Sequence, residues 1–108
     1  SGGLLFAGGL SSVVPMPPLG GMALASAALR NYAITLHAAL EASGVFAGTI
    51  TIGGLVDRGD IHQAISSNQE MLAGLTATIL DPDELAEMVW QLYLDGTEPE
   101  VVVDALGV

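Results

Sequence analysis

Residues 45–54 read VFAGTITIGG, and this stretch decides the fold. Five of its first eight residues are β-branched, none is charged, and two glycines end it. β-Branched side chains favour extended backbone, and a strand that is covered on both faces is apolar along its length instead of alternating with polar residues. The stretch therefore predicts a buried parallel strand over residues 45–52 that stops at Gly53 and Gly54.

The segment before this strand favours a helix. Residues 21–43 are rich in alanine and leucine, which are strong helix formers. Apolar residues recur through it at helical spacing: Leu24, Ala28, Leu29, Tyr32, Ala33, Leu36, Ala39 and Leu40. Gly44 is a natural stop, because glycine readily adopts the left-handed backbone conformation at a helix end. We predict one long helix over residues 21–43.

The chain upstream of this helix predicts another strand and a loop. Residues 4–7 form the apolar run LLFA, which ends at Gly8 and Gly9. Such a run is typical of a fully buried parallel strand that leads into a permissive turn. Residues 11–18 contain three prolines, which remove backbone donors and disfavour helical backbone in the residues before them. We expect that segment to be a loop.

The patterning after residue 56 is weak at first and strong later. Residues 57–78 predict a loop with one or two short helices, around residues 61–65 and 70–75. Asp81, Pro82 and Glu84 then suit the N-cap, first and third positions of a helix with a capping box. Gly96 suits its end.

One face of this later helix is apolar. The stripe consists of Leu85, Met88, Val89 and Leu92, with Glu84, Glu87 and Gln91 placed toward water. Trp90 and Tyr93 adjoin the stripe, so packing is favoured over ligand stacking for both. After Pro99, residues 101–103 read VVV and predict a third strand.

The resulting order is strand, helix, strand, helices, strand. Strands that alternate with helices form parallel sheets with crossover connections. We therefore predict an α/β fold: a partial doubly wound, Rossmann-like parallel sheet of about three strands with flanking helices, as a single partial domain over residues 1–108.

The composition limits the classes of partner. Charged residues make up 13% of the chain, against roughly 25% in an ordinary domain, so the surface is unusually neutral or a partner covers part of it. Residues 1–56 contain only Arg30 and Glu41 as charged residues, and the rest of the chain carries the net charge of −10. With no lysine and two arginines, the chain offers no basic patch for nucleic acid or for an anionic membrane.

Two further features concern location. The chain has no cysteine, which excludes disulfides and thiolate chemistry and is compatible with the cytoplasm, where we expect the protein. Residues 19–40 are apolar, but Arg30 and Asn31 lie near the middle of this stretch. A central arginine costs about 2.5–3.5 kcal/mol in a membrane, so a buried helix of a water-soluble domain is the better interpretation.

These pieces together resemble the C-terminal half of the short-chain dehydrogenase/reductase family. In that family a long helix opens with Tyr-x-x-x-Lys and commonly continues Ala-Ala-Leu, and the following strand ends in Pro-Gly. Here residues 27–29 read AAL, Gly53 and Gly54 occupy the Pro-Gly position, and residues 81–95, DPDELAEMVWQLYLD, are similar to the family's late helix. The resemblance covers most of the chain.

The same register places Met22 at the family's catalytic Tyr position and Ser26 at its Lys position. In the family the Tyr exchanges a proton with the substrate oxygen, and the Lys ammonium lowers the pKa of that Tyr and holds the nicotinamide ribose. A thioether has no exchangeable proton and a serine hydroxyl has no charge. The resemblance therefore implies an oxidoreductase fold without its standard catalytic pair, that is, a pseudoenzyme or an inactive part of an enzyme.

Other site residues also follow from the resemblance. Ser11 or Ser12 falls close to the family's substrate-orienting Ser, although serines beside glycine often bond their own loop backbone. Residues 53–56, namely Gly53, Gly54, Leu55 and Val56, would contact NAD or NADP in a complete parent protein. The Gly-rich turn that binds the dinucleotide phosphates is missing, so we expect no cofactor on this chain alone.

The remaining polar candidates favour structural roles. His37 with Glu41 at i+4 could form a carboxylate–imidazole pair, but a second ligand pair is missing, so we predict no metal site. His62 near Asp57 and Asp60 reads as a solvated acidic face. The acidic run of Glu98, Glu100 and Asp104 reads as a solubilising surface.

Two hypotheses remain open. In the first, the chain is part of an NAD(P)-dependent oxidoreductase and is completed by an N-terminal half. In the second, it is a non-catalytic, homo-oligomeric interaction module derived from the same fold. Either partner, a second copy or the missing half, would contact the neutral helix over residues 21–43, because a helix with so little charge suits burial on more than one side.

Overall fold

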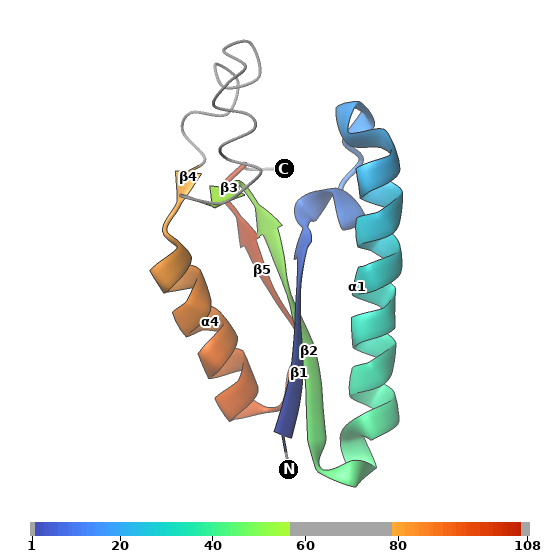
Figure 1. Ribbon diagram of the computed structural model, residues 1–108, viewed down its shortest axis with the longest axis vertical. Helices are drawn as coiled ribbons and strands as arrows, with labels where there is room; N and C mark the ends of the chain where they lie inside the picture. Colours follow the sequence, from blue (N-terminus) through green and yellow to red (C-terminus); the bar gives the residue numbers. More distant parts are fainter. Residues whose placement is uncertain (1, 57–78, 107–108) are drawn as a thin grey trace.

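A computed structural model of the chain describes residues 2–56 and 79–106 (Figure 1). The strands are β1 (Gly2–Gly9), β2 (Val45–Gly53), β3 (Leu55–Val56), β4 (Ile79–Leu80) and β5 (Glu100–Asp104), and the helices are α1 (Gly20–Leu40) and α4 (Pro82–Asp95). Single 3-10 turns lie at Leu10–Ser12, Pro17–Leu19 and Glu41–Ser43.

The main sheet is three-stranded and entirely parallel, in the order β1-β2-β5. Helix α1 covers one face and α4 covers the other (Figure 1). The predicted α/β class and its parallel sheet with flanking helices are confirmed. A separate parallel pair, β3 with β4, lies beyond the carboxyl end of β2. The sequence analysis did not predict this pair.

Strand β2 is the centre of the fold, as its composition predicted. Ala47, Thr49, Ile50 and Thr51 are each at most 3% exposed. Strands β1 and β5 differ from β2, because each of them is an edge strand of the described sheet. The interpretation of residues 4–7 as fully buried was therefore wrong, since β1 pairs on one side only.

Helix α1 begins and ends close to its predicted bounds. A 3-10 turn over Glu41–Ser43 follows it, and Gly44 then closes the helix in the left-handed conformation at φ 80°. Ala33 is the fully buried residue of the helix, while Leu24 is 75% exposed and Tyr32 is 56% exposed. The helix thus buries a narrow stripe and leaves apolar side chains uncovered.

Helix α4 begins at the predicted cap, where the Asp81 side chain accepts a hydrogen bond from the Asp83 backbone N–H at 3.0 Å. Leu85 and Leu92 are buried, as predicted. The stripe was wrong at Met88, which is 40% exposed, because α4 packs on the sheet along the line of Leu85 and Leu92. The packing predicted for Trp90 is likewise incomplete, since its side chain is 52% exposed.

Two boundaries differ from the predictions. Strand β5 begins at Glu100 and ends at Asp104, one residue longer at each end than residues 101–103. The segment expected to be a loop contains a 3-10 turn at Pro17–Leu19, which accepts proline at its first positions. The short helices expected around residues 61–65 and 70–75 lie outside the described residues.

Candidate functional site

The carboxyl edge of the parallel sheet gathers most of the predicted site residues. Ser11 and Ser12 lie in the 3-10 turn that follows β1, and Met22 lies in the first turn of α1. Gly53 ends β2, and its register partner Asp104 ends β5. Ligands of open α/β sheets bind outside the carboxyl ends of the strands, so this edge is the candidate site.

A close contact fixes the ends of β1 and β2 against each other. Leu10 is 4% exposed, and a Cβ atom added to Gly53 would lie 2.5 Å from the Leu10 Cδ2 atom. Glycine is favoured at position 53 because Leu10 would have to shift to make room for any side chain there. The structure thus gives Gly53 a packing role that is separate from cofactor binding.

The residues after Gly53 are held in extended backbone. Leu55 and Val56 form β3 and pair with Ile79 and Leu80 of β4. Their main chain therefore takes part in a ladder at the candidate edge, where the resemblance implied that residues 53–56 would contact a cofactor.

The Ser12 hydroxyl at this edge lies in an unusual environment. Its Oγ atom is buried and makes no hydrogen bond within the described part of the chain. The expectation that this serine bonds its own loop backbone is therefore wrong for Ser12. A buried hydroxyl without a partner costs about 1–3 kcal/mol, so the position suits a polar group supplied from elsewhere.

Met22 and Ser26, at the family's Tyr and Lys positions, lie on the first two turns of α1. The Met22 side chain is 55% exposed, and Ser26 is half-buried. Neither side chain can act as an acid or a base near neutral pH. The structure places both residues near the strand ends, and their chemistry leaves the proton-transfer role unfilled.

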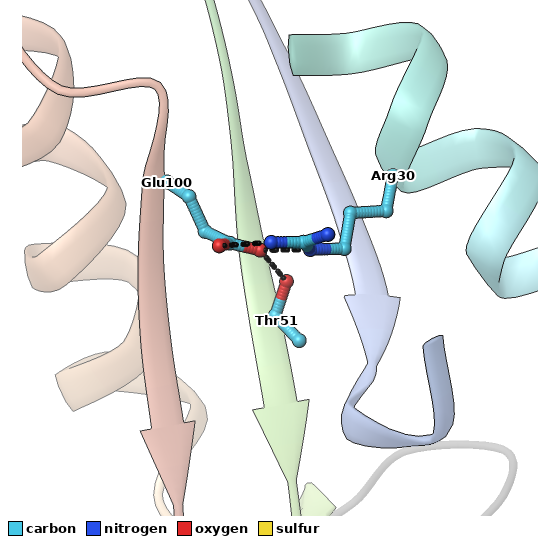
Figure 2. Close-up of polar contacts among 3 residues, drawn as sticks. All are labelled: Arg30, Thr51 and Glu100. Carbon is cyan, nitrogen blue, oxygen red and sulfur yellow. Dashed lines mark hydrogen bonds and ion pairs between the residues drawn. The ribbon is translucent and has the colours of Figure 1, made fainter. Parts of the chain in front are cut away.

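The best-defined polar cluster joins α1, β2 and β5 (Figure 2). The Arg30 guanidinium donates from Nε to Glu100 Oε2 at 2.6 Å and from Nη2 to Glu100 Oε1 at 2.8 Å. The Thr51 hydroxyl donates to the same Oε2 atom at 2.6 Å. This bidentate geometry is the strongest arrangement available to an arginine and a carboxylate.

The cluster shifts the pKa values of both charged groups. The hydrogen bond from Arg30 is the main reason that the pKa of the Glu100 carboxyl lies below its ordinary value of 4.5. Burial acts in the opposite direction, while Thr51 and the positive charge of Arg30 lower this pKa further. The hydrogen bond to Glu100 likewise raises the pKa of Arg30.

Sequence reasoning missed this cluster. Glu100 was interpreted as part of a solubilising surface, which is wrong because its side chain is 14% exposed. Glu100 is the register partner of Thr49, so its carboxylate lies on the α1 face beside Thr51 and within reach of Arg30. The one available signal was an arginine in the middle of an otherwise uncharged helix, which requires a partner if it is covered.

His37 has a structural role. Its Nδ1 atom lies 2.8 Å from the Ala47 carbonyl oxygen, and its ring meets Phe46 edge-on at a centroid distance of 5.5 Å. A carbonyl oxygen only accepts, so Nδ1 carries the hydrogen. The predicted alternative, a pair with Glu41, is not formed. Within residues 2–56 and 79–106, no group of three or more His, Cys, Asp or Glu side chains could hold a metal ion.

Two further predictions concern the acidic segment around His62 and the crossing of a membrane. His62, Asp57 and Asp60 lie outside the described residues. Neither of the described helices is both long enough and apolar enough to cross a membrane.

Comparison of the chain with protein families, with curated proteins and with solved structures finds no match. The function is therefore inferred from the geometry of its own residues.

Proposed function

We propose that this chain is the substrate-side half of an oxidoreductase domain that resembles the short-chain dehydrogenase/reductase family, and that it is inactive alone. One observation carries the proposal. The parallel order β1-β2-β5 has α1 and α4 on opposite faces, and Ser12, Met22 and Gly53 all lie near the carboxyl ends of the strands. This is the arrangement that the resemblance implies.

The residues present do not fit NAD or NADP without a further half. A dinucleotide site needs a tight glycine turn that leads directly from a strand into a helix N-terminus. Here residues 10–19 separate β1 from α1 and include two 3-10 turns, and β2 leads into β3 instead of a helix. We therefore assign no cofactor to this chain alone and expect NAD or NADP only in a completed protein.

The catalytic step would also lack its usual groups. Met22 offers no proton to a substrate oxygen, and Ser26 offers no positive charge to lower the pKa of a neighbouring acid. Of the two candidate serines, Ser11 and Ser12, the second is favoured for a contact with substrate, because its buried hydroxyl has no partner among the described residues. A completed protein would thus hold a ligand more readily than it would reduce one.

A titration of the 108-residue chain with NADH and then NADPH tests the missing cofactor site. Trp90 is the single tryptophan, so energy transfer from it to a bound nicotinamide would report binding. We expect no saturable signal with either nucleotide. Saturable binding in the micromolar range would contradict the proposal.

The reading frame upstream of Ser1 tests the completed domain directly. We expect it to encode a strand, a GxxxGxG turn and a helix. A natural start codon immediately upstream of Ser1 would overturn the proposal of a completed enzyme. It would favour the second candidate, a non-catalytic interaction module.

A separate observation favours this second candidate function. Arg30 is the only lysine or arginine of α1, and Glu100 engages it, so the outward side of the helix carries no free positive charge. Met22, Leu24 and Tyr32 are each more than half exposed on the same helix. An uncharged helix surface of this kind is typical of contact with a partner.

A further inference from the structure

The free edge of β1 is suited to pairing. Strand β1 bonds to β2 on one side, and on its other side no strand lies among the described residues. Edge strands of monomers usually carry charges or prolines that prevent further pairing. Gly2–Gly9 contains neither, whereas β5 at the opposite edge begins with Glu100 and ends with Asp104. The β5 edge therefore carries charges that oppose further pairing, and the β1 edge does not.

Both faces of β1 also need cover. Phe6 meets Tyr32 of α1 edge-on at 6.1 Å, so Phe6 and Leu4 lie on the α1 face. A Cβ added to Gly3 would contact the Tyr93 ring of α4, so Gly3 and Leu5 lie on the α4 face. Leu4 is 47% exposed and Leu5 is 43% exposed. A partner strand must therefore be apolar on both of its faces.

Helix α1 extends this surface. The Phe6–Tyr32 contact places the Tyr32 flank of α1 over β1, while Arg30 reaches the other way toward Glu100. Helical spacing puts Leu29 and Met22 on the Tyr32 flank. These residues are 38% and 55% exposed. The β1 edge and this uncharged helix flank form one continuous docking face.

The charge distribution selects a second copy of the chain as the occupant. Each copy carries a net charge of −10, so two copies repel each other across most of their surfaces. Residues 1–56 sum to zero, because Arg30 and Glu41 cancel. The docking face lies entirely within these residues. Two copies therefore approach through this face with little repulsion.

We propose that two copies pair through their β1 strands, antiparallel and related by a two-fold axis at Leu5. A two-fold axis perpendicular to the sheet keeps the two faces distinct, so only residues of the same face can lie opposite each other. Leu5 then lies opposite Leu5 of the partner subunit. Leu4 lies opposite Phe6 of the partner subunit, on the α1 face.

This geometry also places the two α1 helices on the same face of the joined sheet. Helix α1 packs mainly on β2 and also on β1, so its axis lies between β2 and the boundary of the two strands. Two to three strand spacings of about 4.8 Å then separate the two α1 axes by about 10–14 Å, so side chains on their facing flanks can meet. The six strands would form one continuous sheet.

The expected affinity is modest. The β1 edge is about 26 Å long at 3.3 Å per residue, and a helix layer plus the sheet is roughly 20 Å high. This footprint of about 500 Å² per copy totals about 1,000 Å², near the lower limit for a specific interface. We expect a dissociation constant in the micromolar range.

Pairing of two copies does not require descent from an oxidoreductase. A completed domain would place a strand of its N-terminal half on the same edge, so the two occupants compete. No strand among residues 2–56 and 79–106 covers this edge, and the oligomeric state of the chain is measured independently of nucleotide binding. A monomer that binds no nucleotide overturns the pairing alone, and a dimer that binds NADH overturns the proposed function alone.

Oxidative cross-linking tests the register. The chain contains no cysteine, so Leu5→Cys introduces a single thiol next to the two-fold axis. Val102→Cys is the matched control, because Val102 is 49% exposed on the opposite edge strand. We expect L5C to form a disulfide-linked dimer and V102C to remain monomeric. Equal cross-linking of both variants, or none by L5C, would overturn the proposal.

Sedimentation measures the same contact without a thiol. Leu5→Lys places two ammonium groups opposite each other at the axis, and we expect the dissociation constant to rise by at least about tenfold. Val102→Lys should leave it unchanged, and circular dichroism should show both variants folded. A monomeric unmodified chain throughout the micromolar range, or a dimer more sensitive to V102K than to L5K, would overturn the pairing.

Discussion

Removal of the Glu100 carboxylate should weaken the attachment of β5 to the rest of the fold. The carboxylate accepts two hydrogen bonds from Arg30 and one from Thr51. The Arg30 side chain is 32% exposed, so water would solvate its guanidinium after the substitution, and the ion pair contributes at most about 1 kcal/mol. Thr51 is 1% exposed and would lose the acceptor of its hydroxyl, at a cost of about 1–3 kcal/mol.

These contributions predict a loss of about 1–4 kcal/mol in the free energy of unfolding for Glu100→Ala. Glu100→Gln keeps one acceptor and the shape of the side chain, so we expect a loss of about 1 kcal/mol. Thr51→Val removes the buried hydroxyl together with its need for an acceptor, and it should cost about 1 kcal/mol. The informative result is a larger loss for E100A than for either E100Q or T51V.

Urea unfolding followed by Trp90 fluorescence measures each value, because Trp90 is the only tryptophan. A double-mutant cycle with Arg30→Met isolates the ion pair. The association of copies proposed above is held constant by working at one low protein concentration. A loss below about 0.5 kcal/mol for E100A would refute the reasoning, since ordinary surface substitutions fall within that range.

The same variants predict a pH dependence. The pKa of Glu100 is lowered in the folded state, so the unfolded chain takes up the proton more readily. The contribution of the carboxylate is complete above its ordinary pKa of 4.5 and is lost as the pH falls through the lower, folded pKa. We expect the stability gap between the unmodified chain and E100Q to shrink below that pH. A gap that widens in acid would contradict the assigned direction.

Three further substitutions test other contacts. Gly53→Ala should destabilise the fold by about 1–3 kcal/mol, because the added Cβ would lie 2.5 Å from the Leu10 side chain. Gly8→Ala is the control, because a Cβ at Gly8 meets no atom within 4 Å, and thermal unfolding measures both variants. Asp81→Ala should cost about 1 kcal/mol through loss of the α4 cap, and circular dichroism should show the lost helix signal; an unchanged transition would contradict the cap. Ser12→Ala should leave stability unchanged or raise it by up to about 1 kcal/mol in urea unfolding, because the buried hydroxyl has no partner in the described part of the chain; a clear loss would reveal a hydrogen bond there.

The elements of the fold could be predicted because their signals are local. The β-branched run of β2, the alanine-rich α1 and the Asp81–Pro82 start of α4 each depend on residues that are neighbours in the sequence. The parallel orientation of the strands followed from general rules for strands that alternate with helices. The short β3–β4 pair carried no such signal, because two residues on each side contain no periodicity.

The polar cluster could not be predicted for the opposite reason. Arg30 and Glu100 are separated by 70 positions, and nothing near either residue indicates the other. Their meeting depends on the β2–β5 register, which places Glu100 beside Thr49, and on the rotation of α1 over the sheet. The placement of Ser12, Met22 and Gly53 relative to the sheet was easier to anticipate, because residues at the carboxyl ends of parallel strands gather at one edge whatever the details of packing. The functional roles of these residues stay predictions.

The error at β1 is the most informative, because its composition suits full burial and the described sheet supplies cover on one side only. Full burial of a leucine side chain is worth about 1.5–3 kcal/mol, so covering the exposed half of Leu4 and Leu5 yields about 1 kcal/mol for each of them. Four such leucines in a pair of copies yield about 4 kcal/mol. Association itself costs at least about 4 kcal/mol, so the leucines alone only offset that cost. Stable pairing must therefore also depend on the hydrogen bonds between the two strands and on the Tyr32 flank of α1. We accordingly expect Tyr32→Glu to weaken the dimer. Leu24→Glu should not weaken it, because Leu24 lies on the side of α1 away from β1.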